Sequence, residues 1–128
     1  MGVGMLAVSK MIGFVPTKDS AKARIFYKGK LGFRFVSDDM FALVMNAGEH
    51  MIRIAKAKDF IAAPYTVLGW EVSNIEDVVA GLSERGVTFE KYPFIQDAKL
   101  GIWTAPTGDK VAWFKDPDGN VLSVSQHK

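Results

Sequence analysis

Serine and histidine side chains are the first candidates for chemistry. Ser123 and Ser125 carry hydroxyl groups, and His50 and His127 carry imidazoles that could transfer protons or bind a metal. We find no base directly beside either serine, so a serine nucleophile is not the favoured interpretation. The two histidines share no short spacing with another metal ligand, and we therefore expect both at the surface.

Carboxylates are more numerous, but their positions indicate structural roles. The pairs Asp38-Asp39 and Asp116/Asp118 fall in predicted turns, where aspartate oxygens accept hydrogen bonds from backbone N–H groups. A further group lies on the polar face of a predicted helix and is interpreted as solvated: Glu76, Asp77 and Glu84.

Two charged residues remain as candidates for a binding site, Arg53 and Glu71. Each lies on a predicted strand, on the face expected to point away from the helices. One interpretation is an ion pair between them. The other is that Arg53 anchors the carboxylate or phosphate of a ligand, because its guanidinium matches bidentate oxyanions.

Aromatic side chains supply flat apolar surface for a ligand. Trp103 lies in the segment 100–106, Trp113 lies beside a predicted hairpin, and Phe14 lies on the first predicted strand. Trp70 is expected in the core. A tryptophan on an inserted segment is well placed to cover a pocket and stack on a planar ligand.

Composition narrows the class of protein. A chain of 128 residues is one domain with room for a core, and a net charge of +2 from interspersed acids and bases gives no indication of nucleic-acid binding. The absence of cysteine excludes disulfides, thiolate metal sites and a cysteine nucleophile. No apolar run approaches the ~20 residues that span a membrane, and residues 1–10 lack the features of a signal peptide. We expect a cytoplasmic protein with no nucleic-acid or membrane partner.

The elements that must position these residues form one unit repeated. In the first half, about 11–56, a strand at 11–17 precedes a helix capped by Asp19 or Ser20 and ended near Gly29 and Gly32. Strands are predicted next at 33–37, 41–45 and 51–55. The order is β-α-β-β-β.

The second half, about 65–127, shows the same order. A strand at 65–72 precedes a helix capped by Ser73 or Asn74 and ended at Arg85-Gly86. The following strands are predicted at 87–90, 111–114 and 121–125. Asp19 and Asn74 are 55 positions apart, and Gly32 and Gly86 are 54 apart. Residues 92–108 form an insertion that has no counterpart in the first half.

A tight turn is predicted between the last two strands. The turn is expected to begin at Asp116, with Pro117 at its second position because proline fixes φ. Gly119 suits the last position because glycine adopts positive φ. Two β-α-β-β-β units have unpaired sheet edges and uncovered faces, which they can cover by joining into one curved sheet. We therefore predict an α+β fold whose curved mixed sheet forms a trough with helices outside; a ferredoxin-like sandwich is the alternative.

Ordered motifs along nearly the whole chain resemble the vicinal oxygen chelate superfamily, which includes glyoxalase I, the bleomycin-resistance proteins and the extradiol dioxygenases. They are 19–27 with 31–33, 69–72 with 75–77, 85–87, and 114–120. The resemblance implies paired modules, usually dimeric, that act on a small molecule in the trough.

Enzymes of that superfamily hold a divalent metal through His, Gln or Glu on the first and last strands of each module. The resemblance places these positions at Ile12, Arg53, Val67 and Ser123 of this chain. Isoleucine and valine cannot coordinate, arginine repels a cation, and serine is a poor neutral ligand. We therefore expect no bound metal and no other cofactor.

Three functions follow from these observations. The favoured one is a metal-independent small-molecule binder of the glyoxalase/bleomycin-resistance type, which we expect to be a homodimer. Whether it is an enzyme stays open, because the superfamily includes lyases and dioxygenases whereas the usual metal ligands are missing from this chain. The alternatives are a divergent glyoxalase-like lyase, isomerase or dioxygenase with a non-standard site, and a scaffold whose trough binds nothing. The expected ligand-binding residues are Phe14, Arg53, Glu71, Trp103, Trp113 and Ser123.

Overall fold

A computed structural model describes residues 4–128, which form two four-stranded sheets. The first half contains β1 (Ile12–Thr17), α1 (Ser20–Arg24), a π-helical turn η1 (Ile25–Lys30), β2 (Arg34–Asp38), β3 (Ala42–Ala47) and β4 (His50–Lys56). The second contains β5 (Thr66–Glu71), α2 (Ile75–Glu84), β6 (Trp103–Thr104), β7 (Lys110–Lys115) and β8 (Val121–Gln126). Among the described residues, no helix is long and apolar enough to cross a membrane.

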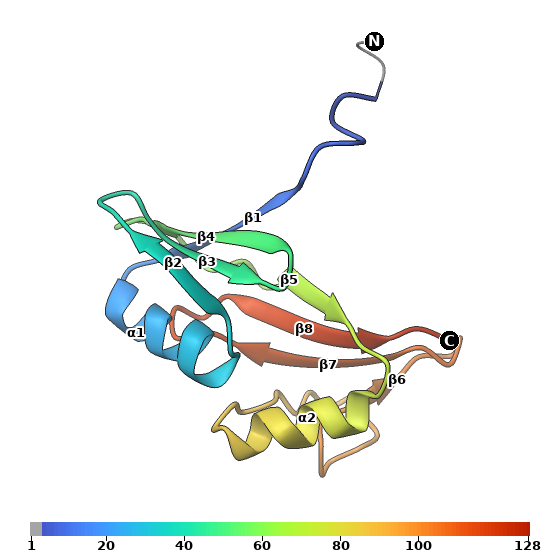
Figure 1. Cartoon of the computed structure of the whole chain (residues 1–128). Coiled ribbons are helices and arrows are strands. Elements are labelled where there is room, and N and C mark those ends of the chain that lie inside the picture. The colour runs from blue at the N-terminus through green and yellow to red at the C-terminus, as the bar shows by residue number, and fades with distance from the viewer. Residues whose placement is uncertain (1–3) are drawn as a thin grey trace.

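The two sheets share one topology. Their strand orders are β1-β4-β3-β2 and β5-β8-β7-β6, and in each sheet the first strand pairs in parallel with the last. In Figure 1, α1 lies below the first sheet and α2 lies below the second, and residues 4–11 rise from the top as an arm that leaves the body. The predicted α+β fold of paired β-α-β-β-β modules is confirmed.

Both helices begin at the predicted caps. The side chain of Asp19 accepts a hydrogen bond from Lys22 N, and that of Asn74 accepts one from Asp77 N. These contacts satisfy backbone donors that have no partner within the helix. Gly32 follows the first helix with a φ of +80°, a conformation that L side chains rarely adopt, so the chain can reverse into β2.

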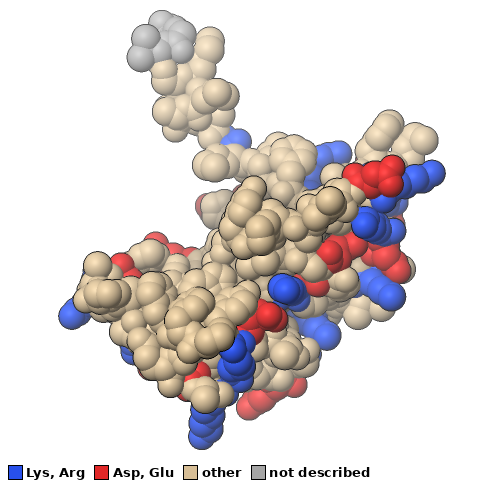
Figure 2. Space-filling model, turned by 180° about the vertical axis from the view of Figure 1, so that it is seen from behind, with Lys and Arg blue, Asp and Glu red and all other residues tan. Residues whose placement is uncertain are grey.

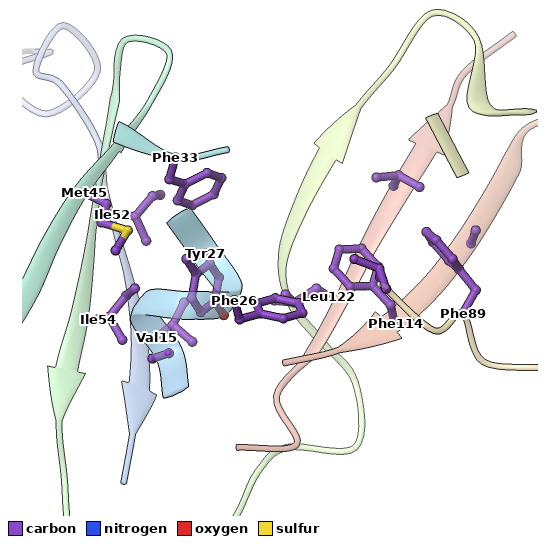
Figure 3. Close-up of a cluster of buried hydrophobic side chains, with 14 of the residues drawn as sticks. Val15, Phe26, Tyr27, Phe33, Met45, Ile52, Ile54, Phe89, Phe114 and Leu122 are labelled. Atoms are coloured by element: carbon purple, nitrogen blue, oxygen red, sulfur yellow. The ribbon is translucent and has the colours of Figure 1, made fainter. Parts of the chain in front are cut away.

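The hydrophobic core lies between the helices and the inner faces of both sheets. In Figure 3, Phe26 projects from its helix between the sheets, with Val15 and Ile54 on one side and Leu122 and Phe114 on the other. Phe26 and Phe114 have ring centroids 6.3 Å apart. One helix therefore packs against residues of both modules. Trp70 is half-buried and packs against this core.

The edge strand of the second sheet differs from the prediction. Val87 and Phe89 are buried, but their segment forms only an isolated bridge, from Phe89 to Phe114, in place of the expected strand at 87–90. The edge position is taken by β6 within the insertion, where Trp103 pairs with Val111. The alternating apolar residues of 87–90 therefore mark a core segment, and the insertion completes the repeat.

An irregularity in β5 changes which side chains share a face. The pairing between β5 and β8 shifts between Thr66 and Leu68, so that Val67 is an extra residue. Such a bulge bends a strand and re-aims a side chain. It brings the Thr66 hydroxyl within 3.3 Å of the Ser123 hydroxyl. The resemblance placed a metal-ligand position at Val67, but on this strand it is the Thr66 side chain that contacts Ser123.

Candidate functional site

The faces of the two sheets that point away from the helices are here called the trough face. On the second sheet, Trp113 and Gly69 pair with Ser123 and point to this face, whereas their neighbours Phe114 and Val124 are buried in the core. Gly69 leaves the backbone accessible beside the Ser123 hydroxyl, which would lie 3.2 Å from an added Cβ. The trough face of this sheet thus combines two hydroxyls with an indole.

Four aromatic rings gather on this face and are here called the aromatic cluster: Tyr92, Phe94, Trp103 and Trp113. Phe94 meets Trp103 and Trp113 edge-on, with centroids 6.0 and 5.9 Å apart, and Tyr92 meets Trp113 at 5.8 Å. Trp103 and Trp113 lie 6.0 Å apart. Spacings of this size are typical of favourable aromatic pairs. The insertion supplies three of the four rings, and β7 supplies Trp113.

A hollow of about 640 Å³ opens beside the aromatic cluster. Its volume falls within the roughly 300–1,000 Å³ of small-molecule sites. Tyr65 and Phe94 are exposed at its border, and each offers a ring to a ligand. The residues that line the hollow include Tyr65, Thr66, Tyr92, Phe94, Trp113 and Lys115. This hollow is the candidate ligand site beside the aromatic cluster.

Trp113 lines this hollow, whereas Trp103 packs behind Trp113 and Phe94. Ser123 is buried beneath it and contacts Thr66, which lines it. The structure therefore brings three of the six expected ligand-binding residues to one place.

Phe14 and Arg53 lie on the other sheet. They pair with each other across β1 and β4 and share the trough face, where Phe14 is 62 % exposed and Arg53 is half-buried. The backbone N–H groups of Ala42 and Phe41 hold the pKa of the Asp39 carboxyl below its ordinary value, and the charge of Arg53 adds to this effect. Arg53 therefore lies within the field of a carboxylate of its own module.

Glu71 is exposed at the end of β5, where it pairs with Ser125 on the trough side. None of the ion pairs formed within residues 4–128 includes Glu71 or Arg53. The expected ion pair between these two residues is thus not formed in the structure.

One contact near the carboxyl end was missed by the sequence analysis. The Ser125 hydroxyl lies 3.0 Å from His127 Nε2, so this serine does have an imidazole partner, two residues further along the chain. His127 is exposed, as expected. Asp109 accepts a hydrogen bond from Lys128 N, so its carboxylate is engaged by the backbone beside the histidine. The pair is an exposed contact near the carboxyl end of β8.

The positions at which enzymes of the superfamily carry metal ligands do not bring suitable ligand side chains together in this structure. Ile12 and Arg53 stand on the first sheet, and Thr66, brought into line by the bulge, stands beside Ser123 on the second. Within residues 4–128, no group of three His, Cys, Asp or Glu side chains is placed to hold an ion. The neutral hydroxyls and the guanidinium are poor ligands for a divalent transition metal.

Comparison with known sequences agrees with this fold and these motifs. The sequence profile of the Glyoxalase/Bleomycin resistance protein/Dioxygenase superfamily matches residues 7–124. The chain therefore belongs to this superfamily, and the resemblance inferred from the sequence is confirmed. No curated protein matches the chain.

Solved structures share the fold. A glyoxalase family protein from Enterococcus faecalis is 24% identical, with a TM-score of 0.75, over 94% of this chain and 99% of its own. A superfamily member from Sphaerobacter thermophilus is 22% identical, with a TM-score of 0.71, over 96% and 100% of the two chains. One from Alicyclobacillus acidocaldarius is 14% identical, with a TM-score of 0.72, over 94% and 92%. At these identities the similarity shows the fold alone.

Sequence reasoning missed five of the lining residues named above: Tyr65, Thr66, Tyr92, Phe94 and Lys115. Tyr92 and Phe94 alternate within an insertion that also carries Trp103, and this aromatic enrichment was a usable signal. Thr66 had no such signal in the sequence, because the position of its side chain depends on the bulge in β5.

Proposed function

We propose that this protein is a metal-independent small-molecule-binding protein of the glyoxalase/bleomycin-resistance type, which holds its ligand on the trough face of the second sheet. The observation that carries the proposal is the hollow beside the aromatic cluster. Aromatic walls with a few polar groups are typical of sites for planar organic molecules. The enzyme alternative has no comparable support, because the metal-ligand positions carry no suitable donors.

The architecture supports this assignment of the site. Trp113, Thr66 and Lys115 come from strands, which hold side chains more precisely than loops. Tyr92 and Phe94 come from the insertion, whose position is fixed by packing of their rings on Trp113. A ligand ring between Tyr65 and Phe94 would contact apolar surface on both of its faces.

A thermal-shift screen of planar aromatic compounds, followed by calorimetric titration of the best ligand, tests the proposal. Phe94→Ala removes a ring from the cluster, and we expect it to weaken binding by about 0.5–1.5 kcal/mol or more. Phe41→Ala is the matched control, because Phe41 is also a highly exposed phenylalanine but precedes β3 on the other sheet. Equal effects of the two substitutions would contradict the assignment of the site.

We also propose a homodimer in the cytoplasm. The described part of the arm, residues 4–11, carries Met5, Leu6, Val8 and Met11 with 62–87 % of their surface exposed. Figure 2 shows this arm standing clear of the body, with charged side chains gathered mainly toward the opposite side of the view. Contiguous exposed apolar surface of this kind is typical of an interaction site. A second copy of the chain would cover it.

A further inference from the structure

The charges on the trough face indicate which ligands the hollow would select. Lys115 is the charged residue that lines it, and Trp113, two residues earlier on β7, points to the same face. The nearest carboxylate, that of Glu90, lies 3.9 Å from Lys115 Nζ, at the limit of an ion pair. The ammonium is about half exposed and therefore has N–H donors available for a ligand.

Two hydroxyl groups lie on the same face. Thr66 borders the hollow, and Ser123 lies 3.3 Å from it. Hydroxyls can donate hydrogen bonds to the oxygen atoms of a ligand. Arg53 stands on the other sheet and does not line this hollow. The positive charge available at the aromatic cluster is thus that of Lys115.

We propose that the ligand of this site is a planar aromatic anion, with its ring against the aromatic cluster and its carboxylate or other oxyanion directed to Lys115. This inference rests on the proposed function and adds the class of ligand. It assigns the anionic anchor to Lys115, where the sequence analysis had considered Arg53. An ammonium and hydroxyl donors complement an anion, whereas a cationic ligand would meet the charge of Lys115 unfavourably.

Three probes of one shape and different charge test the inference: 2-naphthoate, 2-naphthamide and 2-naphthylmethylammonium. The chain has three tryptophans, and their indole N–H signals in ¹H–¹⁵N correlation spectra separate the faces of the sheet. Trp103 and Trp113 report on the aromatic cluster, whereas Trp70 packs on the helix side against Phe33 and Phe114. We expect saturable shifts at Trp103 and Trp113, with naphthoate bound most tightly.

Lys115→Gln should weaken naphthoate binding by about three- to tenfold and leave naphthamide binding unchanged. Lys110→Gln is the matched control, because Lys110 lies on the same strand but faces the other side and pairs with Glu76. Its substitution should not alter either affinity. A second substitution, Arg53→Gln, should also leave naphthoate binding unchanged.

The outcomes separate this inference from the proposed function. Preferred binding of the cationic probe, or equal binding of all three, would overturn the anionic ligand while leaving the hollow as a binding site. Loss of naphthoate binding in Arg53→Gln but not in Lys115→Gln would overturn the anchor. Absence of any shift at Trp103 and Trp113 with all three probes would contradict the proposed function itself.

Discussion

The hydroxyl of Tyr27 donates a 2.6 Å hydrogen bond to Asp116 Oδ2, joining the helix of the first module to the hairpin of the second. Both residues are buried. Asp116 also accepts hydrogen bonds from Asn120 and from the backbone N–H of Asp118, and Asn120 donates to the carbonyl of Pro16 on β1. The predicted turn therefore also forms a polar contact between the modules.

Tyr27→Phe should lower the free energy of unfolding. The substitution removes a donor to a buried carboxylate while keeping the ring in the core, and a hydrogen bond to a charged group contributes about 1.5–3 kcal/mol. Denaturant unfolding followed by circular dichroism measures the change. Tyr65→Phe is the control, because Tyr65 is 67 % exposed, and it should have little effect. Equal effects of the two variants would contradict the role of Tyr27.

Alkaline pH should destabilise the protein through the same residue. Burial raises the pKa of Tyr27 above its ordinary value of 10.0, and the charge of Asp116 raises it further. The folded state thus keeps a proton that the unfolded chain releases above about pH 10, so the free energy of unfolding falls as the pH rises beyond that value. Unfolding curves at a series of pH values should show a shallower decline for Tyr27→Phe. Identical slopes would argue against this protonation linkage.

Two glycines should respond in opposite directions to alanine. Gly119 ends the hairpin with a φ of +85°, and an added Cβ would meet only Ala62 at an ordinary 3.7 Å, so the cost is backbone strain of roughly 1–2 kcal/mol. Gly81 lies in α2 with no atom within 4 Å of its added Cβ, and Gly81→Ala should stabilise by about 0.5–1 kcal/mol. Thermal unfolding of both variants measures the signs, and a stabilising Gly119→Ala would contradict the turn geometry.

Much of the fold was predictable because its signals are local. The caps at Asp19 and Asn74 and the glycine of the hairpin act within a few residues of their own positions. The side-chain contact of Thr66 with Ser123 depends on a bulge between two strands distant in sequence, which no local pattern specifies. Apolar residues at Val87 and Phe89 alternate with polar ones, as in a strand. They do so because both side chains are buried in the core, although the segment forms only an isolated bridge.

The candidate site was predictable in part. The insertion singled out Trp103, the predicted hairpin singled out Trp113, and the family resemblance singled out Ser123. The structure places these three residues together. Lys115 was not considered, because a lysine beside a hairpin is usually solvated and only the neighbouring hollow distinguishes it. Phe14 and Arg53 share the predicted face but stand on the first sheet, whose distance from the aromatic cluster depends on how the two sheets curve.

The arm should contribute to a dimer. Burial of a leucine or valine side chain contributes about 1.5–3 kcal/mol, so Leu6→Asp combined with Val8→Asp should shift a dimer toward monomer. Sedimentation velocity at micromolar concentration measures the assembly. Met40→Asp is the control, because Met40 is 78 % exposed but lies in the turn before β3. A monomeric unmodified protein would contradict the proposed dimer.

Binding by the metal-stripped protein tests the central claim most directly. The protein is treated with EDTA, its metal content is checked by elemental analysis, and 2-naphthoate is titrated while the indole signals are recorded. We predict saturable shifts of the indole signals of Trp103 and Trp113. Added zinc or manganese should not change the affinity, because the neutral Thr66 and Ser123 hydroxyls need no ion between them and the ligand. Shifts that occur only after a divalent metal is restored would contradict the account.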